Sequence, residues 1–258
     1  MVSYAELHAH SNFSFLEGAS HIEELVLRAR ELGYEALALT DHDGLHGAME
    51  FAQCARAWGL KPITGAEVTL GSPLRDKSHS FPKAEGFNPQ ESSYSHHLTL
   101  LCETQQGYAN LCRLLTHAHL DHERGKPCIE PEVLAQHTEG VIALSGCRRG
   151  EVPSLVAQGR YREAEEAARR YLRWFGPGNF FVELQNNLVY GDARRNRALS
   201  NLAEHLGVGI VATGDVHYHV RERHQLQDVL VAIKHRTTLD TSHRLRRENS
   251  EYYLKPPA

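Results

Sequence analysis

Seven short apolar runs are spread along the chain, separated by longer stretches of mixed polarity. They are rich in Val, Ile, Leu, Ala and Thr, a composition typical of buried β-strands. The runs are YAEL (4–7), EALALT (35–40), KPITGAEVTL (61–70), HHLTLLCE (96–103), GVIALS (140–145), NFFVEL (179–184) and VGIVATGDV (208–216). The sequence therefore predicts seven strands.

Four of the intervening stretches space their apolar residues as amphipathic helices do. They cover residues 20–32, 47–58, 161–175 and 193–206. A glycine follows each of them, as expected at the end of a helix. Ser20 is the expected N-cap of the first helix, because Glu23 follows it at capping-box spacing. Strands alternating with helices predict an α/β fold with a parallel sheet, and seven such units without an internal boundary favour one closed barrel.

Two segments depart from this alternation. Residues 71–96 are rich in Ser, Pro, Gly and charge and lack periodicity, so we expect a polar insertion loop there. The segment at about 240–258 ends in EYYLKPPA without a helix end or cap, and we expect it to lead toward a further domain. The whole chain, 1–258, is predicted to be a single domain.

Side chains that can bind metal stand at the end of most predicted strands. In chain order they are His8 and His10, then Asp41, His42 and Asp43, then Glu67, Cys147 and Glu183, and finally Asp215, His217 and His219. The fourth strand is an exception, because His96 and His97 open it. In a parallel barrel the carboxyl ends of all strands meet on one face. Imidazole, carboxylate and thiolate groups converging there predict a metal site, although any single His pair would be weak evidence.

Another group of possible ligands is expected to be unrelated to this site. His117, His119, Asp121 and His122 lie close together in the sequence, but at the end of the helical stretch 107–119. We interpret them as a solvated helix end.

Composition narrows the range of functions. The chain has 41% hydrophobic and 23% charged residues, as an ordinary folded protein does, and a formal charge of −4. This charge argues against a sequence-independent DNA coat, but not against an enzyme acting on a DNA end. No apolar run approaches the length of a membrane span, and no secretory signal is visible at the start. The five cysteines never form C-x-x-C, which favours a reducing, cytoplasmic location.

Six segments in order carry a family resemblance. They are ELHAHSNFSFLEGAS (6–20), ALTDHDGLHGAMEF (38–51), PITGAEVTL (62–70), HHLTLLCET (96–104), ALSGC (143–147) and ATGDVHY (212–218). Together they resemble the polymerase-and-histidinol-phosphatase (PHP) domain, most closely the N-terminal PHP domain of bacterial C-family DNA polymerases of the error-prone branch. The resemblance implies a distorted seven-stranded (β/α)7 TIM-like barrel that binds up to three divalent ions of Zn, Mn or Fe. It also implies a polymerase core, in cis or as a partner, beyond residues 240–258.

The same resemblance implies a set of metal ligands. They are His8, His10, Glu17, His42, Glu67, His97, Cys147, Asp215 and His217. Glu17 stands where relatives with a complete site have Asp, so one ion is expected to be held weakly. Cys147 stands where many relatives have His, and a thiolate favours zinc or a similarly thiophilic ion. Asp41 is expected to support the neighbouring His42 rather than to bind metal.

The predicted reaction is hydrolysis of a phosphodiester at a DNA 3′ end, of the 3′–5′ exonuclease or proofreading type. Two close divalent ions can activate water and hold phosphate oxygens, with Glu67 as the bridging carboxylate by resemblance. A third ion, on residues such as His8, His10 and Asp215, would stabilise the leaving oxygen. Arg148 and Arg149 are candidate phosphate contacts, with a solvated loop as the alternative.

Two other functions remain open from the sequence. The domain would be a metal-stabilised structural module of a polymerase with weak or no catalysis, or a phosphomonoesterase of the histidinol-phosphatase type. The polymerase-like stretch 96–115 argues against the latter.

A basic run over residues 233–250 is predicted either to bind the DNA backbone or to form a solvated or interdomain surface. Its cations are Lys234, Arg236, Arg244, Arg246 and Arg247.

Overall fold

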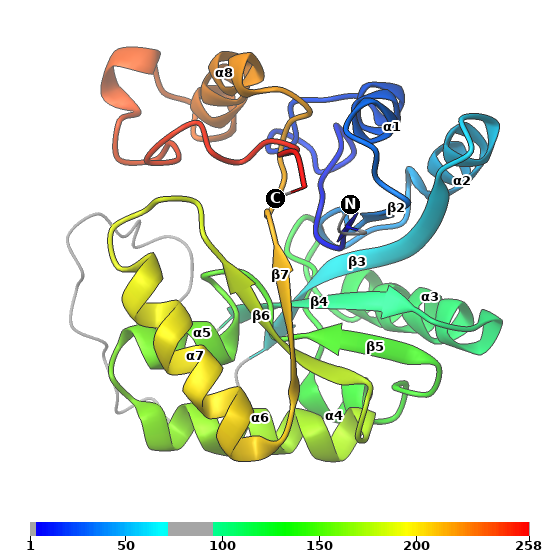
Figure 1. Cartoon of the computed structure of the whole chain (residues 1–258), viewed down its shortest axis with the longest axis vertical. Helices are drawn as coiled ribbons and strands as arrows, with labels where there is room; N and C mark the ends of the chain where they lie inside the picture. The colour runs from blue at the N-terminus through cyan, green and yellow to red at the C-terminus, as the bar shows by residue number, and fades with distance from the viewer. Residues whose placement is uncertain (1–3, 72–94, 258) are drawn as a thin grey trace.

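A computed structural model describes residues 4–71 and 95–257 of the chain. Seven strands form one sheet in the order β1 to β7 (Figure 1). Their bounds are β1 Ala5–Glu6, β2 Ala36–Leu39, β3 Lys61–Gly71, β4 Ser95–Cys102, β5 Val141–Leu144, β6 Phe180–Gln185 and β7 Gly209–Thr213. Each strand lies on one of the seven apolar runs, so the strand prediction is confirmed.

The two edges of the sheet meet just beyond the ends of β1 and β7. Ala9 forms a parallel bridge with Val216. The His10 N–H donates to the Val216 carbonyl at 2.8 Å, and the Val216 N–H donates to the His8 carbonyl at 2.9 Å. These bonds nearly close the sheet into a barrel, which confirms the distorted seven-stranded barrel expected from the sequence.

The prediction of an all-parallel sheet is wrong at one strand. β4 runs antiparallel to both β3 and β5, whereas the other neighbouring pairs are parallel. An antiparallel neighbour needs no helical crossover, and the stretch before β4 has no helical periodicity in the sequence. The reversal places the amino end of β4 at the rim where its neighbours have their carboxyl ends. His97 therefore reaches the same rim, which explains why its strand opened with ligands instead of ending with them.

Eight α-helices cover the barrel in the described part of the chain (Figure 1). They are α1 Ile22–Glu31, α2 Ala48–Ala57, α3 Gln105–Leu120, α4 Pro131–Ala135, α5 Glu151–Ala157, α6 Tyr161–Phe175, α7 Asp192–Leu206 and α8 His224–Lys234. All four predicted helices are present within one or two residues of the expected bounds. Most of the expected insertion 71–96 falls on residues 72–94, outside the described residues. Its margins, Gly71 and residues 95–96, belong to β3 and β4.

The predicted N-cap of the first helix is wrong by one residue. The N-cap of α1 is His21, whose backbone N–H donates to Glu24 at 2.9 Å. The Ser20 hydroxyl instead accepts the His219 N–H at 2.9 Å and contacts His219 Nδ1 at 2.7 Å. A tertiary contact with the chain after β7 therefore takes the hydroxyl that the capping box would have used.

Two apolar clusters hold the strand ends in place. The larger one packs α3, α5, α6 and α7 against the sheet and includes Leu111, Val152 and Phe180. The second packs α1 and α2 against β2 through residues such as Ile22 and Phe51. Among the described helices, none is both long enough and apolar enough to cross a membrane.

Candidate metal centre

The barrel rim gathers the predicted ligands around a cavity of about 360 Å³. The lining residues are Glu17, His42, Glu67, His97, Cys147, Arg148, Arg149, Asp215, Arg247, Glu248 and Tyr252. His8, His10 and His217 are buried and lie against these residues. Residues from six of the seven strand ends thus meet in one place, together with Glu17 from the loop after β1.

His8 and His10 turn the same ring atom toward the centre. His8 Nδ1 lies 2.7 Å from Glu183 Oε1, and His10 Nδ1 lies 3.1 Å from the Ser14 hydroxyl. The Nε2 atom of each ring is buried and has no hydrogen-bond partner among the described residues. These two nitrogens face Glu67 and Asp215, at distances between 3.5 and 3.8 Å.

The spacing of these atoms fits a cation. A nitrogen and an oxygen 3.5–3.8 Å apart are too far for a good hydrogen bond. Two ligands that each lie about 2.0–2.2 Å from one tetrahedral ion are separated by roughly 3.3–3.6 Å, which is close to the observed spacing. Leaving a buried polar atom without a partner costs about 1–3 kcal/mol, and metal coordination would remove that cost. The donor set of imidazole nitrogen and carboxylate oxygen therefore fits a divalent ion.

A second group of donors lies on the other side of Glu67. The Oε2 atom of Glu67 lies 2.9 Å from His42 Nδ1 and 3.1 Å from His97 Nδ1. Cys147 Sγ lies 3.5 Å from the same His97 nitrogen. Glu67, 1% exposed, thus has both oxygens within reach of different histidines, as a carboxylate shared between two ions would.

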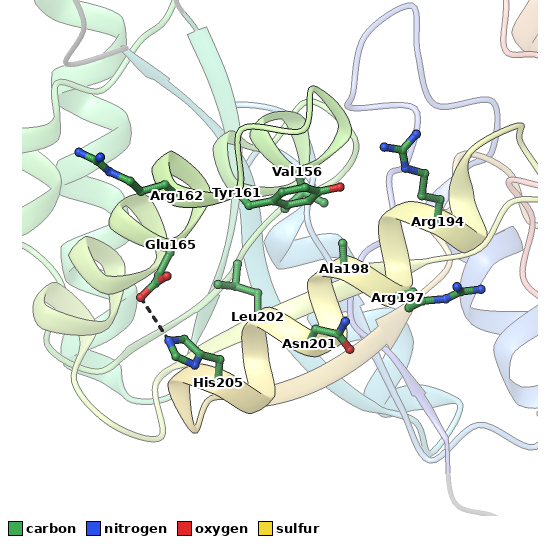
Figure 2. A pocket seen from close by; sticks show the side chains of 10 residues that line it. All are labelled: Val156, Tyr161, Arg162, Glu165, Arg194, Arg197, Ala198, Asn201, Leu202 and His205. Atoms are coloured by element: carbon green, nitrogen blue, oxygen red, sulfur yellow. Dashed lines mark ion pairs between the residues drawn. The ribbon is translucent and has the colours of Figure 1, made fainter.

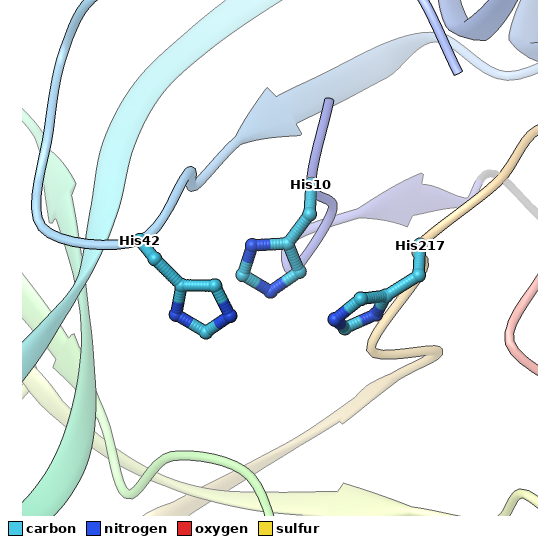
Figure 3. Close-up of side chains that lie close together, drawn as sticks. All are labelled: His10, His42 and His217. Carbon is cyan, nitrogen blue, oxygen red and sulfur yellow. The ribbon is translucent and has the colours of Figure 1, made fainter. Parts of the chain in front are cut away.

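A third group consists of histidine rings. His10 lies between His42 and His217, with ring centroids 4.3 and 4.4 Å away (Figure 3). Glu17 Oε2 lies 2.7 Å from His42 Nε2, so Glu17 also reaches this group. Two cations from the C-terminal part of the chain contact it as well: Lys234 pairs with Glu17, and Arg247 contacts His217 Nε2 at 2.5 Å.

The protonation properties of the ligands reflect their crowding. Burial by itself raises the pKa of Glu67, but His97, His42 and His8 lower it well below its usual value. Burial opposes protonation of His42, yet Glu17 and Glu67 raise its pKa to about 10. Burial and the Glu67 charge raise the pKa of the Cys147 thiol well above normal. The raised pKa values of His42 and Cys147 favour protons on donors from which a bound metal ion would displace them.

Backbone strain is concentrated around the centre. Asp215 has φ of 49°, Leu16 next to Glu17 has φ of 63°, and Asp43 next to His42 has φ of 47°. A non-glycine residue in this left-handed region costs about 1–3 kcal/mol and persists only where its surroundings impose it. Each of these residues lies at or beside a proposed ligand.

Asp41 acts on a different histidine from the one we expected. It accepts hydrogen bonds from the Ser11 N–H at 2.7 Å, the Ser11 hydroxyl at 2.8 Å and the Ser14 hydroxyl at 2.6 Å. Ser14 in turn contacts His10 Nδ1. Asp41 therefore orients His10 through Ser14, while the backbone N–H of His42 donates to the same hydroxyl at 3.1 Å. Because Asp41 directly precedes His42 in the sequence, we had expected it to support the His42 ring instead.

The two candidate phosphate contacts line the cavity. Arg148 Nη1 also forms an ion pair with Glu248 at 2.8 Å, which links the loop after β5 to the C-terminal segment. Asp43, one of the strand-end side chains, accepts hydrogen bonds from the backbone and side chain of Thr69 and so ties the end of β2 to β3.

The sequence did not link three residues to the predicted ligands, although the structure places all three at the site. Glu183 was noted at a strand end, but its contact with His8 depends on the barrel bringing β6 beside β1. Arg247 and Lys234 lay within a basic run with no visible link to the ligands. Their positions follow from the path of the chain after β7.

The expected solvated histidines lie elsewhere. His117 is exposed and pairs with Asp121 at 2.8 Å, and His119 contacts the Asp43 carbonyl. The three candidate metal groups found in residues 4–71 and 95–257 include none of them.

A larger groove of about 620 Å³ lies between α6 and α7 (Figure 2). It is lined by arginines and apolar side chains, with one ion pair between Glu165 and His205 at 3.4 Å. None of the candidate metal groups in the described parts of the chain lies there. The candidate metal ligands are therefore gathered at the smaller cavity on the rim.

Comparisons with known proteins show which family the chain resembles along most of its length. The PHP domain family matches residues 6–187, and Asp215 and His217 lie beyond that match. The error-prone DNA polymerase of Symbiobacterium thermophilum is 42% identical over 99% of this chain and 23% of its own length. DNA polymerase III subunit alpha of Thermus aquaticus is 39% identical over 99% of this chain and 20% of its own length. The chain thus spans about a fifth of the length of these curated relatives.

Two solved structures share the fold at low sequence identity. One is a proposed metal-dependent phosphoesterase from Bifidobacterium adolescentis, with a TM-score of 0.54, 15% identity, and coverage of 84% of this chain and 88% of that chain. The other is an amidohydrolase from Chromobacterium violaceum with bound sulfate, with a TM-score of 0.51, 16% identity, and coverage of 83% and 87%. The family match covers more than half of the chain, and the polymerase relatives align over nearly all of it. The chain therefore belongs to the PHP domain family.

Proposed function

We propose that this chain is a metal-dependent phosphoesterase that hydrolyses phosphodiesters at DNA 3′ ends, of the 3′–5′ exonuclease type, within an error-prone or polymerase III alpha-type DNA polymerase. The observation that carries the proposal is the pair of buried His8 and His10 Nε2 atoms facing Glu67 and Asp215. Among the described residues neither nitrogen has a hydrogen-bond partner, which is the arrangement expected of metal ligands.

The ligands divide between the groups described above. His8, His10, Glu67 and Asp215 would hold one ion, and Glu67 with His97 and Cys147 would hold a second. The remaining candidates for ligation are Glu17, His42 and His217. The bound ions would supply Lewis-acid activation of water and charge neutralisation at the phosphate. Zinc, manganese and iron all accept such donors, and the Cys147 sulfur favours zinc at the second position.

The protein's own groups would position the substrate. Arg148 and Arg149 line the cavity beside the ligands, and a guanidinium group matches two phosphate oxygens. A DNA substrate is proposed because the two curated relatives described above are DNA polymerases, which would also provide a polymerase core in cis.

A second candidate function is a metal-stabilised structural domain of such a polymerase. The contacts of Lys234 with Glu17 and of Arg247 with His217 favour it, because both ligands are already paired with protein cations. A phosphomonoesterase acting on histidinol phosphate uses the same chemistry on a different substrate.

The decisive experiment compares two substrates on one preparation. The chain is supplied with Mn²⁺ or Zn²⁺ and mixed with a 3′-recessed DNA duplex or with histidinol phosphate, and released nucleotide or phosphate is measured. We expect metal-dependent release of nucleotides from the 3′ end. His10→Ala should lower the rate by at least about a hundredfold, while the matched control His117→Ala, an exposed histidine outside the centre, should leave it unchanged.

Each other outcome selects an alternative. Release of phosphate from histidinol phosphate but not of nucleotides from DNA would support the phosphomonoesterase. Metal binding without hydrolysis of either substrate would support the structural domain.

A further inference from the structure

Three candidate metal ligands are already in contact with cations that belong to the protein itself. Arg247, from the segment after α8, contacts His217 Nε2 at 2.5 Å and Asp215 Oδ2 at 3.2 Å. Lys234, at the end of α8, forms an ion pair with Glu17 Oε1. Glu17 and His217, together with His42, are the ligand candidates left over once the first two ions are assigned.

The contacts of the two His217 ring nitrogens indicate where its proton lies. Nδ1 lies 2.8 Å from the carbonyl oxygen of Asp215, which can only accept, so we assign the proton to Nδ1. Arg247 Nη2 lies 3.2 Å from Nδ1 but only 2.5 Å from Nε2, which agrees with this assignment. The lone pair of the neutral ring is then on Nε2. That lone pair accepts the Arg247 N–H, so the same lone pair is not available to a metal ion while Arg247 is in place.

Glu17 is shared in a similar way. One of its oxygens contacts His42 Nε2 at 2.7 Å, and the other contacts the Lys234 ammonium group. The Gln227 side chain on the same helix donates to the Glu17 carbonyl at 3.1 Å, so α8 is held against the loop that carries Glu17.

Arg247 is also held in place from its other side. Its guanidinium carbon lies 4.1 Å from the centroid of the Tyr252 ring, and Tyr252 is 1% exposed. The Tyr252 carbonyl accepts the His217 N–H at 2.8 Å. Glu248, which follows Arg247 in the chain, pairs with Arg148. Asn249 donates a hydrogen bond to the Asn187 carbonyl at 2.7 Å. The segment that carries Arg247 is thus fastened at several points to the rim.

We propose that Arg247 and Lys234 together take the position of a third metal ion, so that the centre binds two divalent ions and completes its charge with protein cations. A guanidinium and an ammonium group carry two positive charges, the same charge as one divalent ion. Asp215 then has one oxygen for the first metal ion, facing His8 and His10, and the other for Arg247. The inference rests on the proposed metal centre but not on its catalytic activity.

The test counts metal ions per chain. The chain is incubated with excess Zn²⁺ or Mn²⁺, freed of unbound metal by gel filtration, and analysed for metal and protein. We expect about two ions per wild-type chain, and about three in the double variant Arg247→Ala, Lys234→Ala. Arg246→Ala is the matched control, because this neighbouring arginine pairs with Asp228 at 2.9 Å, and its count should stay at the wild-type value.

The outcomes are distinguishable. Three ions in the wild type, or an unchanged count in a double variant that keeps the wild-type circular dichroism, would overturn the inference and leave the proposed phosphoesterase standing. No ions in the wild type would overturn both. If the double variant fails to fold, the single variants Arg247→Gln and Lys234→Gln must each bind more metal per chain than the wild type. The wild-type metal count alone still tests whether the centre binds two ions or three.

Discussion

His8 shows how a single side chain is prepared for one role. Its Nδ1 faces Glu183, and Glu183 is itself fixed by the Thr213 hydroxyl and by Gln185 Nε2 at 3.0 Å. Burial lowers the pKa of His8, but Glu183 and Glu67 outweigh it and raise this pKa well above normal. Carboxylates that receive the second N–H of a ligating histidine orient the ring and increase its basicity. Glu183 is therefore a positioning residue for the first proposed ion.

Replacing Glu183 by Gln tests this role. The amide keeps the size of the side chain but removes the negative charge behind His8, so metal affinity should fall by about 10–100-fold. The affinity is measured by competition with a chromogenic chelator. Glu151→Gln is the control, because Glu151 is a buried carboxylate that pairs with Arg170 and Tyr171 instead of with a candidate ligand. Equal affinities for wild type and Glu183→Gln would contradict the assignment.

At the scale of elements, the 11–18 loop that follows β1 carries much of the site. It contributes Ser14, which contacts His10, and Glu17, which contacts His42. The loop doubles back on itself at Gly18, where an added Cβ would lie 1.9 Å from the backbone oxygen of Ser11. Glycine is required at this position because the backbone of the loop approaches itself too closely for any side chain.

Gly18→Ala should therefore open the loop. Because the clash is with backbone atoms, it cannot be relieved by rotating a side chain, and we expect a destabilisation of about 1–3 kcal/mol together with weaker metal binding. Urea unfolding and metal titration measure the two effects. Gly71→Ala is the matched control, since the nearest atom to its added Cβ lies at an ordinary 3.4 Å. The same loss in both variants would show that the 11–18 loop has no special role.

On the scale of the whole molecule, the proposed ions would join segments that are far apart in the sequence. Glu67 from β3 lies within 3.5 Å of His8, His42 and His97, and Asp215 after β7 faces His8 and His10. A metal ion that binds the folded chain but not the unfolded chain stabilises it by mass action. Metal binding should thus hold the barrel closed as well as activate water.

Metal should consequently raise the melting temperature. With free metal about a thousandfold above Kd, the gain is about 4 kcal/mol, and a chain of this size shifts by roughly 2–4 °C per kcal/mol. Differential scanning calorimetry with metal and with a chelator measures the shift. His10→Ala should lose most of it and His117→Ala should retain it. A melting temperature that does not respond to metal would contradict the proposed centre.

Local pattern in the sequence was enough to predict the strands, the main helices and the strand-end donors around the cavity, whereas Glu17 came from the family resemblance. Apolar runs and helical spacing depend on neighbours a few positions away, so they can be read without coordinates. The choice of His8, His10 and Asp215 followed from the same logic, because strand ends on a barrel share one face. The ligand set itself remains a prediction that metal analysis will test.

Tertiary structure alone decided the remaining features. Three of them depend on contacts between distant segments. They are the antiparallel course of β4, the hydrogen bond between Ser20 and His219, and the orientation of His10 by Asp41 through Ser14. The same is true of Arg247 and Lys234, which the sequence shows only as members of a basic run. Periodicity describes which face of a strand or helix is apolar, but it carries no information about which distant polar group will meet that face. That pairing is set when the barrel closes and the C-terminal segment packs across its rim.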